Sequence, residues 1–220
     1  TGRNLFLTEK LLKILHLFEE HKIPAIPFKG PAIASSAYGD IALRQFSDLD
    51  ILIKRQDVLR AMNLLVSLGY KPEFKLTGGR EKAYLKNQYE LVFSRHERKV
   101  VVELQWEVVP RYFNFSISSL RLWERIMKED SAFPTLPSED ILLILCVHGT
   151  KHIWNQLMWV CDVAQLVRKE LNWERVISQA GTMGSQRMLF LGLFLAENLL
   201  GASLPENVSN RIERDPVVPV

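Results

Sequence analysis

Two aspartates at the start of one apolar strand constrain this chain more than any other feature. The residues from Phe46 to Ile53 read Phe-Ser-Asp-Leu-Asp-Ile-Leu-Ile, and the run that begins at Ile51 predicts a buried β-strand. Side chains alternate between the two faces of a strand, so Asp48 and Asp50 point in the same direction. Their repulsion would turn into attraction around a divalent cation, and Mg²⁺ prefers such oxygen ligands. The alternative is a polar strand end with two solvated carboxylates.

A glycine turn and a short helix precede this strand. Gly30 allows a tight turn, Pro31 suits the first position of a helix, and Gly39 is a natural left-handed end for it. The N–H groups at such a helix start can hold a phosphate, to which Lys29 would add a positive charge. Arg44 lies in the connection to the aspartates, where it could reach a phosphate or pair with a neighbouring aspartate. The alternative is a plain connection with the lysine in solvent.

A third carboxylate stands alone in a later apolar strand. Residues 88–94 and 99–106 have the alternating pattern of two strands, and residues 95–98 predict the polar turn of a hairpin. Glu103 lies in the second strand among valines, where a buried charge is costly unless it is paired or binds a metal. The alternative is an edge strand whose polar face, with Glu103 and Gln105, meets water.

The rest of the chain shows mainly helical periodicity. Amphipathic patterns predict N-terminal helices over residues 8–21 and 57–68, and further helices from residue 138 and over 155–169, 173–180 and 185–200. The expected N-caps are Thr8, Ser138, Asn172 and Ser185. If the helix from residue 138 continues through Gly149, His148 and His152 share one face, as a packed pair or as zinc ligands.

Together these motifs resemble those of the DNA polymerase beta-like nucleotidyltransferase superfamily. Its signature is a glycine turn into a helix, an Asp-x-Asp at a strand start and a third acid on a later strand. Within it, the motifs are similar to those of a bacterial group of uncharacterised nucleotidyltransferases, over roughly residues 8–200. The matching residues are Lys29-Gly30, Arg44, Ser47-Asp48-Leu49-Asp50, Glu103-Leu104-Gln105-Trp106, His148, His152, Trp159 and Asp162.

The resemblance implies an α+β protein with two lobes. A small mixed β-sheet lobe of nucleotidyltransferase type would span residues 1–112, and a helical-bundle lobe would span residues 113–220. The implied reaction moves a nucleoside monophosphate from an NTP to a hydroxyl or phosphate acceptor and releases pyrophosphate. Asp48, Asp50 and Glu103 would be the catalytic residues and would bind Mg²⁺ or Mn²⁺.

The resemblance also implies which residues hold the nucleotide. The expected nucleotide-binding residues are Lys29, Gly30, Arg44, Ser47, His148, Lys151 and His152. The expected partners are an NTP and an unidentified acceptor, either a small molecule or a macromolecule.

Three positions depart from the residues usual in the superfamily. Lys29-Gly30 stands where Gly-Ser is usual, Glu103 where aspartate is usual, and Gln105 where histidine is common. These departures leave open a catalytically degenerate nucleotide-binding or interaction module. A further alternative is a toxin–antitoxin component that modifies a protein or tRNA.

Composition excludes several other classes of protein. The 220 residues suffice for one large or two small domains, and a net charge of +3 gives no support for tight nucleic-acid binding. We find no apolar run of membrane-spanning length and no segment that reads as a signal peptide. Cys146 and Cys161 lie in apolar helical contexts, which favours free thiols and a cytoplasmic location.

Overall fold

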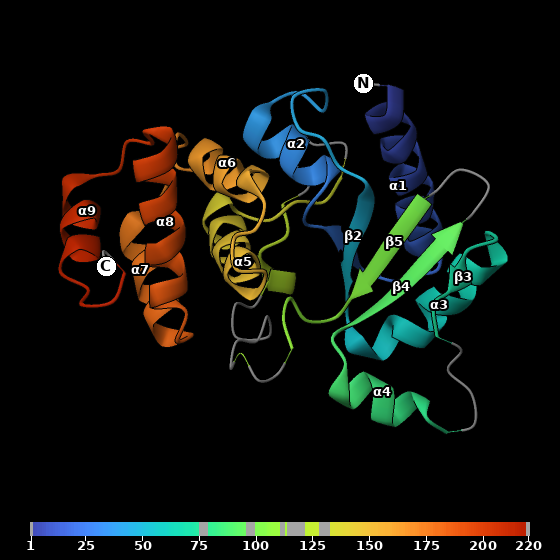
Figure 1. The fold of residues 1–220 in the computed structure, drawn as a ribbon. Coiled ribbons are helices and arrows are strands. Elements are labelled where there is room, and N and C mark those ends of the chain that lie inside the picture. Colours follow the sequence, from blue (N-terminus) through green and yellow to red (C-terminus); the bar gives the residue numbers. More distant parts are fainter. Residues whose placement is uncertain are drawn as a thin grey trace. The chain divides into compact units, whose positions relative to one another are not determined.

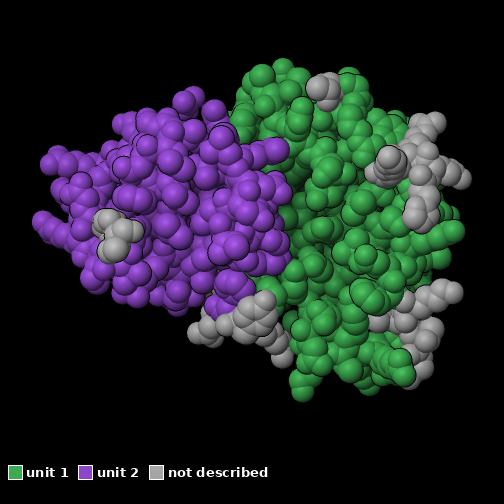
Figure 2. All heavy atoms as spheres, viewed as in Figure 1, with its two compact units in different colours: residues 1–110, 126–136 green, residues 111–125, 137–220 purple. Residues whose placement is uncertain are grey.

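The chain forms two compact units, which are described one at a time. The computed structural model describes residues 2–74, 79–95, 100–110, 113, 122–127 and 133–218. The first unit comprises Thr1–Pro110 with Ile126–Leu136, and the second comprises Arg111–Arg125 with Pro137–Val220 (Figure 2). Residues 126–127 and 133–136, which we assigned to the helical lobe, thus group with the first unit. The functional division at residue 112 stays a prediction.

The first unit combines a β-sheet with helices (Figure 1). Its elements in chain order are α1 (Gly2–Glu20), β1 (Ala25–Pro27), α2 (Pro31–Tyr38), β2 (Asp48–Ile53), the 3₁₀ turn Arg55–Asp57, α3 (Val58–Ser67), β3 (Lys71–Pro72), α4 (Glu81–Asn87), β4 (Glu90–Arg95) and β5 (Val100–Gln105). Predicted turn residues 96–98 lie outside the described part of the chain.

The sheet is mixed, as predicted, with the strand order β1-β2-β5-β4-β3 among the described residues. β2 and β5 are parallel, whereas the other neighbouring strands pair antiparallel. β4 and β5 form the expected hairpin. Because β5 lies between β2 and β4, the alternative that Glu103 belongs to an edge strand is wrong.

One face of the sheet is the hydrophobic core of this unit, covered by α1 and α3 (Figure 1). The fully buried residues on this face include Leu49, Ile51, Ile53, Leu91, Phe93, Val102 and Leu104. Each such leucine, isoleucine or phenylalanine stabilises the fold by about 1.5–3 kcal/mol. Successive side chains of a strand point to opposite faces of the sheet. Asp50 on β2 and Glu103 and Gln105 on β5 therefore lie on the face opposite the core.

Helix α1 begins at Gly2, so the predicted start at Thr8 is wrong. The buried stripe of α1 has helical spacing and runs from Asn4 through Leu7 and Leu11 to Phe18. This stripe continues the helix through Thr8, whose buried hydroxyl finds no hydrogen-bond partner among the described residues. Packing against the sheet therefore outweighs the capping preference of the threonine.

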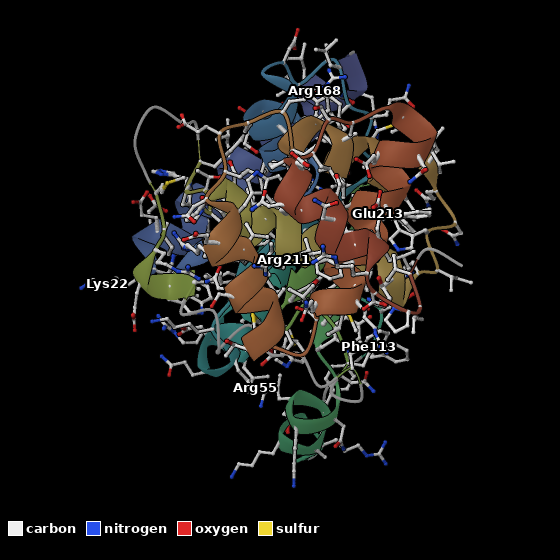
Figure 3. All side chains as sticks on the ribbon, turned by 90° about the vertical axis from the view of Figure 1, so that its left-hand side faces the viewer. Lys22, Arg55, Phe113, Arg168, Arg211 and Glu213 are labelled. Carbon is white, nitrogen blue, oxygen red and sulfur yellow. The ribbon has the colours of Figure 1, made fainter. Side chains whose placement is uncertain are left out.

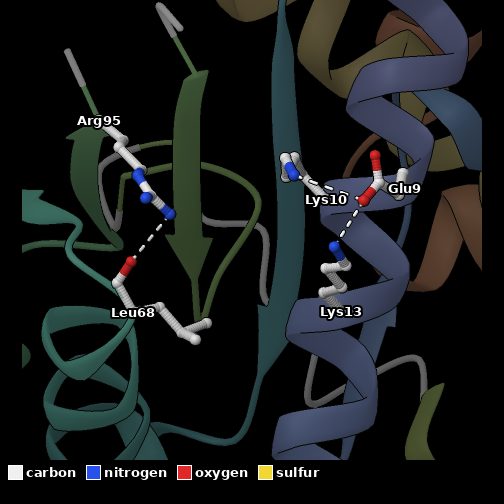
Figure 4. Close-up of polar contacts among 5 residues, drawn as sticks. All are labelled: Glu9, Lys10, Lys13, Leu68 and Arg95. Carbon is white, nitrogen blue, oxygen red and sulfur yellow. Dashed lines mark hydrogen bonds and ion pairs between the residues drawn. The ribbon is translucent and has the colours of Figure 1, made fainter. Parts of the chain in front are cut away.

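Figure 4 shows polar contacts between and within some of these elements. Arg95 Nη1 donates a hydrogen bond of 3.1 Å to the Leu68 carbonyl and so ties β4 to the end of α3 (Figure 4). On α1, Glu9 pairs with Lys10 and Lys13 at 3.5 and 2.6 Å (Figure 4). Exposed pairs of this kind contribute only about 0–1 kcal/mol.

The second unit is helical where it is described. Its elements are the 3₁₀ turn Leu122–Glu124, α5 (Ser138–Lys151), α6 (Leu157–Leu166), α7 (Trp173–Thr182), α8 (Gln186–Leu200) and α9 (Glu206–Glu213). We did not predict α9, a short helix that buries Val208 and Ile212 while Arg211 and Glu213 are exposed (Figure 3). The short elements β3 and α4 of the first unit were missed as well.

Asn172 and Ser185 occupy the predicted N-cap positions of α7 and α8, but only Asn172 makes a side-chain capping bond. Asn172 Oδ1 accepts a 3.0 Å hydrogen bond from the Arg175 N–H. The prediction for Ser138 is wrong, because Ser138 is already the first helical residue of α5. The Ser185 hydroxyl donates to the Ala180 carbonyl at 3.4 Å instead of capping α8.

Two further expectations concern the cysteines and the membrane. Cys146 and Cys161 are free thiols, as predicted, with Cys146 buried and Cys161 partly exposed. In the described ranges, no helix is long and apolar enough to cross a membrane.

A buried carboxylate organises the start of α5. The Asp140 side chain is fully buried, with Arg125 Nη2 at 3.1 Å and Arg175 Nη2 at 3.8 Å from its Oδ1. Burial raises the pKa of Asp140 to about 6, and although the two arginines lower it, they do not cancel that effect. The adjacent Glu139 adds to the rise. The group therefore holds a proton more tightly in the folded chain than in the unfolded chain.

Asp140→Asn should remove part of the pH dependence of the free energy of unfolding. Because the folded pKa of Asp140 is raised, its contribution to stability is full below about pH 4 and is lost as the pH rises through about 6. The loss is on the order of 3 kcal/mol. We expect urea denaturation between pH 4 and 7 to show this slope in the wild type and a smaller one in the variant. Exposed Glu170→Gln should keep the wild-type slope, and equal slopes in all three proteins would contradict the prediction.

Candidate active site

The pairing of β2 with β5 gathers three carboxylates on one face of the sheet. In this parallel pair Asp50 lies directly opposite Glu103, and Asp48 lies opposite Val101. Asp48 and Asp50, two residues apart on β2, therefore share the face on which Glu103 lies. Asp50 is 3% exposed, and Asp48 and Glu103 are half-buried. The three predicted catalytic residues are thus neighbours, although their role stays a prediction.

Lys29 lies beside these carboxylates rather than in solvent, so the alternative of a solvated lysine is wrong. Its Nζ is 2.5 Å from Asp50 Oδ1, and its side chain is only 11% exposed. The Phe28 N–H donates to the Asp50 carbonyl at 3.4 Å, which brings the residue after β1 next to β2. The ammonium also lies 5.3 Å from the centroid of the Phe28 ring.

Gln105 is part of the site in a way that we did not predict. Its Nε2 donates to Asp50 Oδ1 at 3.1 Å and to Glu103 Oε2 at 2.9 Å. The side chain is buried and links the two carboxylates across β2 and β5. The available signal was its position two residues after Glu103, on the same face of the strand.

The charges of the site shift several pKa values. Burial, followed by the charge of Asp50, raises the pKa of Glu103 to about 8. The same two causes raise the pKa of Asp48, against the opposing charges of Lys29 and Arg44. Burial alone would lower the pKa of Lys29, but the charges of Asp50 and Glu103 raise it above its ordinary value. The ammonium is therefore held in its charged form by carboxylates that repel one another.

The Gly30 turn places the start of α2 against the start of β2. Gly30 has φ 55° and ψ −124°, which glycine adopts without steric cost, and Pro31 opens the helix as predicted. A Cβ atom at Gly30 would lie 3.2 Å from the Asp48 carbonyl oxygen. α2 ends at Gly39 in the left-handed conformation, also as predicted. The start of α2 is thus next to the strand that carries the aspartates.

The loop between α2 and β2 is anchored by a residue that we did not single out. Asn4 on α1 is buried, and its Nδ2 donates to the Ile41 carbonyl at 2.5 Å and to the Arg44 carbonyl at 2.9 Å. Arg44 is itself buried, and Ser47 is exposed directly before Asp48. The signal for Asn4 was a polar residue at the end of an otherwise apolar helical stripe.

The remaining predicted nucleotide-binding residues belong to the second unit. α5 continues through Gly149 to Lys151, and His152 follows directly. The rings of His148 and His152 have centroids 4.6 Å apart, and Trp159 on α6 contacts both at 5.1 and 5.3 Å. The histidines are thus a packed aromatic cluster, and their role toward a nucleotide stays a prediction.

The donor chemistry of the site fits a divalent cation. Asp48, Asp50 and Glu103 supply carboxylate oxygens, the ligands that Mg²⁺ and Mn²⁺ prefer. Among the described residues, no group of three or more acidic, histidine or cysteine side chains is already spaced to hold a metal ion. Instead, the Lys29 ammonium and the Gln105 amide contact the oxygens of Asp50 and Glu103.

Comparison with known proteins gives the class of protein to which this chain belongs. The chain belongs to the uncharacterised nucleotidyltransferase family, whose sequence model matches residues 1–201. The protein is therefore a nucleotidyltransferase, and the resemblance noted in the sequence is confirmed.

Solved structures of another nucleotidyltransferase share the fold. Two structures of the antibiotic-resistance factor ANT(2'')-Ia are 12% and 13% identical to this chain, each with a TM-score of 0.57. Each match covers 84% of this chain, and 94% and 99% of the respective neighbour. The second structure is a complex with adenylyl-2''-tobramycin. A search of curated proteins gave no match.

Gly30→Ala should impair the site more than a glycine change at the other end of α2. The new Cβ would face the Asp48 carbonyl in a backbone conformation that alanine rarely adopts, at a cost of about 1–3 kcal/mol. Gly39→Ala is the matched control, because it also has a positive φ but no atom within 4 Å of the added Cβ. Thermal unfolding and nucleotide titration should show the larger loss for Gly30→Ala. Equal losses in the two variants would speak against a close fit at Gly30.

Proposed function

We propose that this enzyme transfers a nucleoside monophosphate from an NTP to a hydroxyl or phosphate acceptor, releases pyrophosphate and depends on Mg²⁺ or Mn²⁺. The observation that carries the proposal is the register that sets Asp50 opposite Glu103, with Asp48 on the same face. Three converging carboxylates beside a helix N-terminus suit a metal-bound triphosphate.

The reaction forms one bond to the α-phosphorus and breaks another. An acceptor oxygen attacks, the bond to the bridging oxygen of the β-phosphate breaks, and pyrophosphate leaves with that electron pair. For a hydroxyl acceptor, Glu103 takes the proton, because it is the carboxylate on β5 that lies opposite Asp50. Asp48 and Asp50 would hold the divalent ions, which neutralise charge on the attacking and leaving oxygens.

The residues around the carboxylates bind the phosphates in this proposal. The start of α2 contributes the positive end of the helix dipole, and Lys29 adds a positive charge. Arg44 and Ser47, in the loop that Asn4 anchors, are placed next to Asp48.

We propose a small molecule with a free hydroxyl group as the acceptor and ATP as the donor. The support comes from ANT(2'')-Ia, which shares the fold and is seen in complex with adenylyl-2''-tobramycin, an adenylylated small molecule. The geometry of the three carboxylates is equally compatible with other acceptors, so the acceptor needs its own experiment.

Asp50→Asn should strongly weaken nucleotide binding that depends on Mg²⁺. Calorimetric titration with ATP, GTP, CTP and UTP, with and without Mg²⁺, should show at least one nucleotide that binds only with the metal. Because Asp50 is buried at the centre of the site, we expect binding to weaken by about a hundredfold or more in the variant. Glu9→Gln, an exposed change of equal charge on α1, should bind like the wild type. No binding of any nucleotide by the wild type would contradict the proposal.

We expect the enzyme to transfer the label from an NTP that is labelled at its α-phosphate to a small molecule. We expect incubation with a size-fractionated cell extract to transfer the label only in the fraction of low molecular mass, because the proposed acceptor is small. Asp50→Asn should transfer none. Label on protein or tRNA would instead favour a macromolecular acceptor and contradict this part of the proposal.

A further inference from the structure

The carboxylates of the site already have a cation among them, supplied by the chain itself. The Lys29 ammonium is 2.5 Å from Asp50 Oδ1, and both side chains are almost fully buried. The charges of Glu103 and Asp48 also act on it. The positive charge of Lys29 is thus placed where the three negative charges converge.

Lys29 and Gln105 both contact the same oxygen atom. Asp50 Oδ1 lies 2.5 Å from Lys29 Nζ and accepts a 3.1 Å hydrogen bond from Gln105 Nε2. A divalent ion that uses this oxygen has to compete with the ammonium, and two cations at such short range also repel each other. Lys29 has a flexible stem of four methylene groups, so its ammonium can move without a change in the backbone.

We propose that Lys29 is an exchangeable counter-ion, which neutralises Asp50 until a divalent ion binds and then passes to the phosphates of the incoming nucleotide. The inference rests on the proposed function, since it requires that the site bind a metal and an NTP. This role is more than a contact with phosphate, because Lys29 competes with the metal ion for Asp50 Oδ1. Binding of the divalent ion therefore releases the Lys29 ammonium, which then contacts the phosphates of the nucleotide.

The coupling predicts opposite effects of Lys29→Met on two ligands. Removing the ammonium removes a competitor, so Mn²⁺ alone should bind about tenfold or more tightly to the chelator-treated variant than to the wild type. ATP in the presence of saturating Mg²⁺ should bind about tenfold or more weakly, because its phosphates lose a positive partner. A residue with only a structural role would not move the two affinities in opposite directions. Electron paramagnetic resonance of free Mn²⁺ and calorimetry measure the two affinities.

Lys10→Met provides a matched control. Lys10 also pairs with a carboxylate, Glu9 at 3.5 Å, and also lies over a phenylalanine ring, 5.0 Å from the centroid of Phe6 (Figure 4 shows the ion pair). It belongs to α1 and takes no part in the proposed chemistry. Both affinities should equal those of the wild type in this variant.

A second measurement on the wild type covers the case in which Lys29→Met does not fold. The Lys29 ammonium can be observed by nuclear magnetic resonance after labelling lysine with ¹⁵N, and its signal can be assigned through its loss in Lys29→Arg. We expect the signal to shift when Mg²⁺ is added and to shift again with ATP. A signal unchanged by saturating Mg²⁺ would overturn the proposal.

The outcomes separate this inference from the function on which it rests. If neither the wild type nor Lys29→Met binds Mn²⁺, the metal site of the proposed function is wrong and the inference falls with it. If both bind Mn²⁺ with equal affinity, only the exchangeable counter-ion is overturned. Tighter binding of Mn²⁺ together with weaker binding of ATP supports it.

Discussion

The parallel pairing of β2 with β5 is the interaction on which the rest of the site depends. It sets Asp50 opposite Glu103. The apolar residues that alternate with these carboxylates along β2 and β5 then lie on the core face. A shift of one residue would turn the carboxylates into the core and the isoleucines of β2 toward the polar face, at a cost of several buried side chains. The hydrophobic core thus specifies the register, and the register specifies the acidic face.

Because the core fixes the position of this acidic face, its negative charges need positive or hydrogen-bonding partners within the protein. Lys29 and Gln105 provide it by direct contacts with Asp50 and Glu103, and burial still leaves the pKa of Glu103 raised to about 8. A purely structural protein gains little from such a cluster, because an apolar face would be more stable. The cost is understandable if the carboxylates bind charged ligands, which is the chemistry of the nucleotidyltransferase family to which the chain belongs.

Two departures from the usual motifs become intelligible in this setting. Lys29 stands in a position where the superfamily usually has a small residue, and in the structure its ammonium pairs with Asp50. Gln105 stands where histidine is common, and it bridges two carboxylates as an uncharged donor. Both residues act on the charges of the site directly, so neither departure by itself indicates a degenerate enzyme.

Local sequence patterns predicted the Gly30 turn into α2, the β4–β5 hairpin and the shared face of Asp48 and Asp50, while the α+β class followed from the resemblance to the nucleotidyltransferases. These features depend on side-chain alternation and on backbone preferences, which act over a few residues. α9 was missed although its two buried residues, Val208 and Ile212, have the four-residue spacing of a helix face. Only the tertiary structure decided that β5 is an interior strand, that Asn4 anchors the loop of Arg44, and that Lys29 and Gln105 meet at one oxygen of Asp50. These contacts join residues far apart in the chain. The hydrophobic pattern of either segment does not indicate which distant segment it will contact.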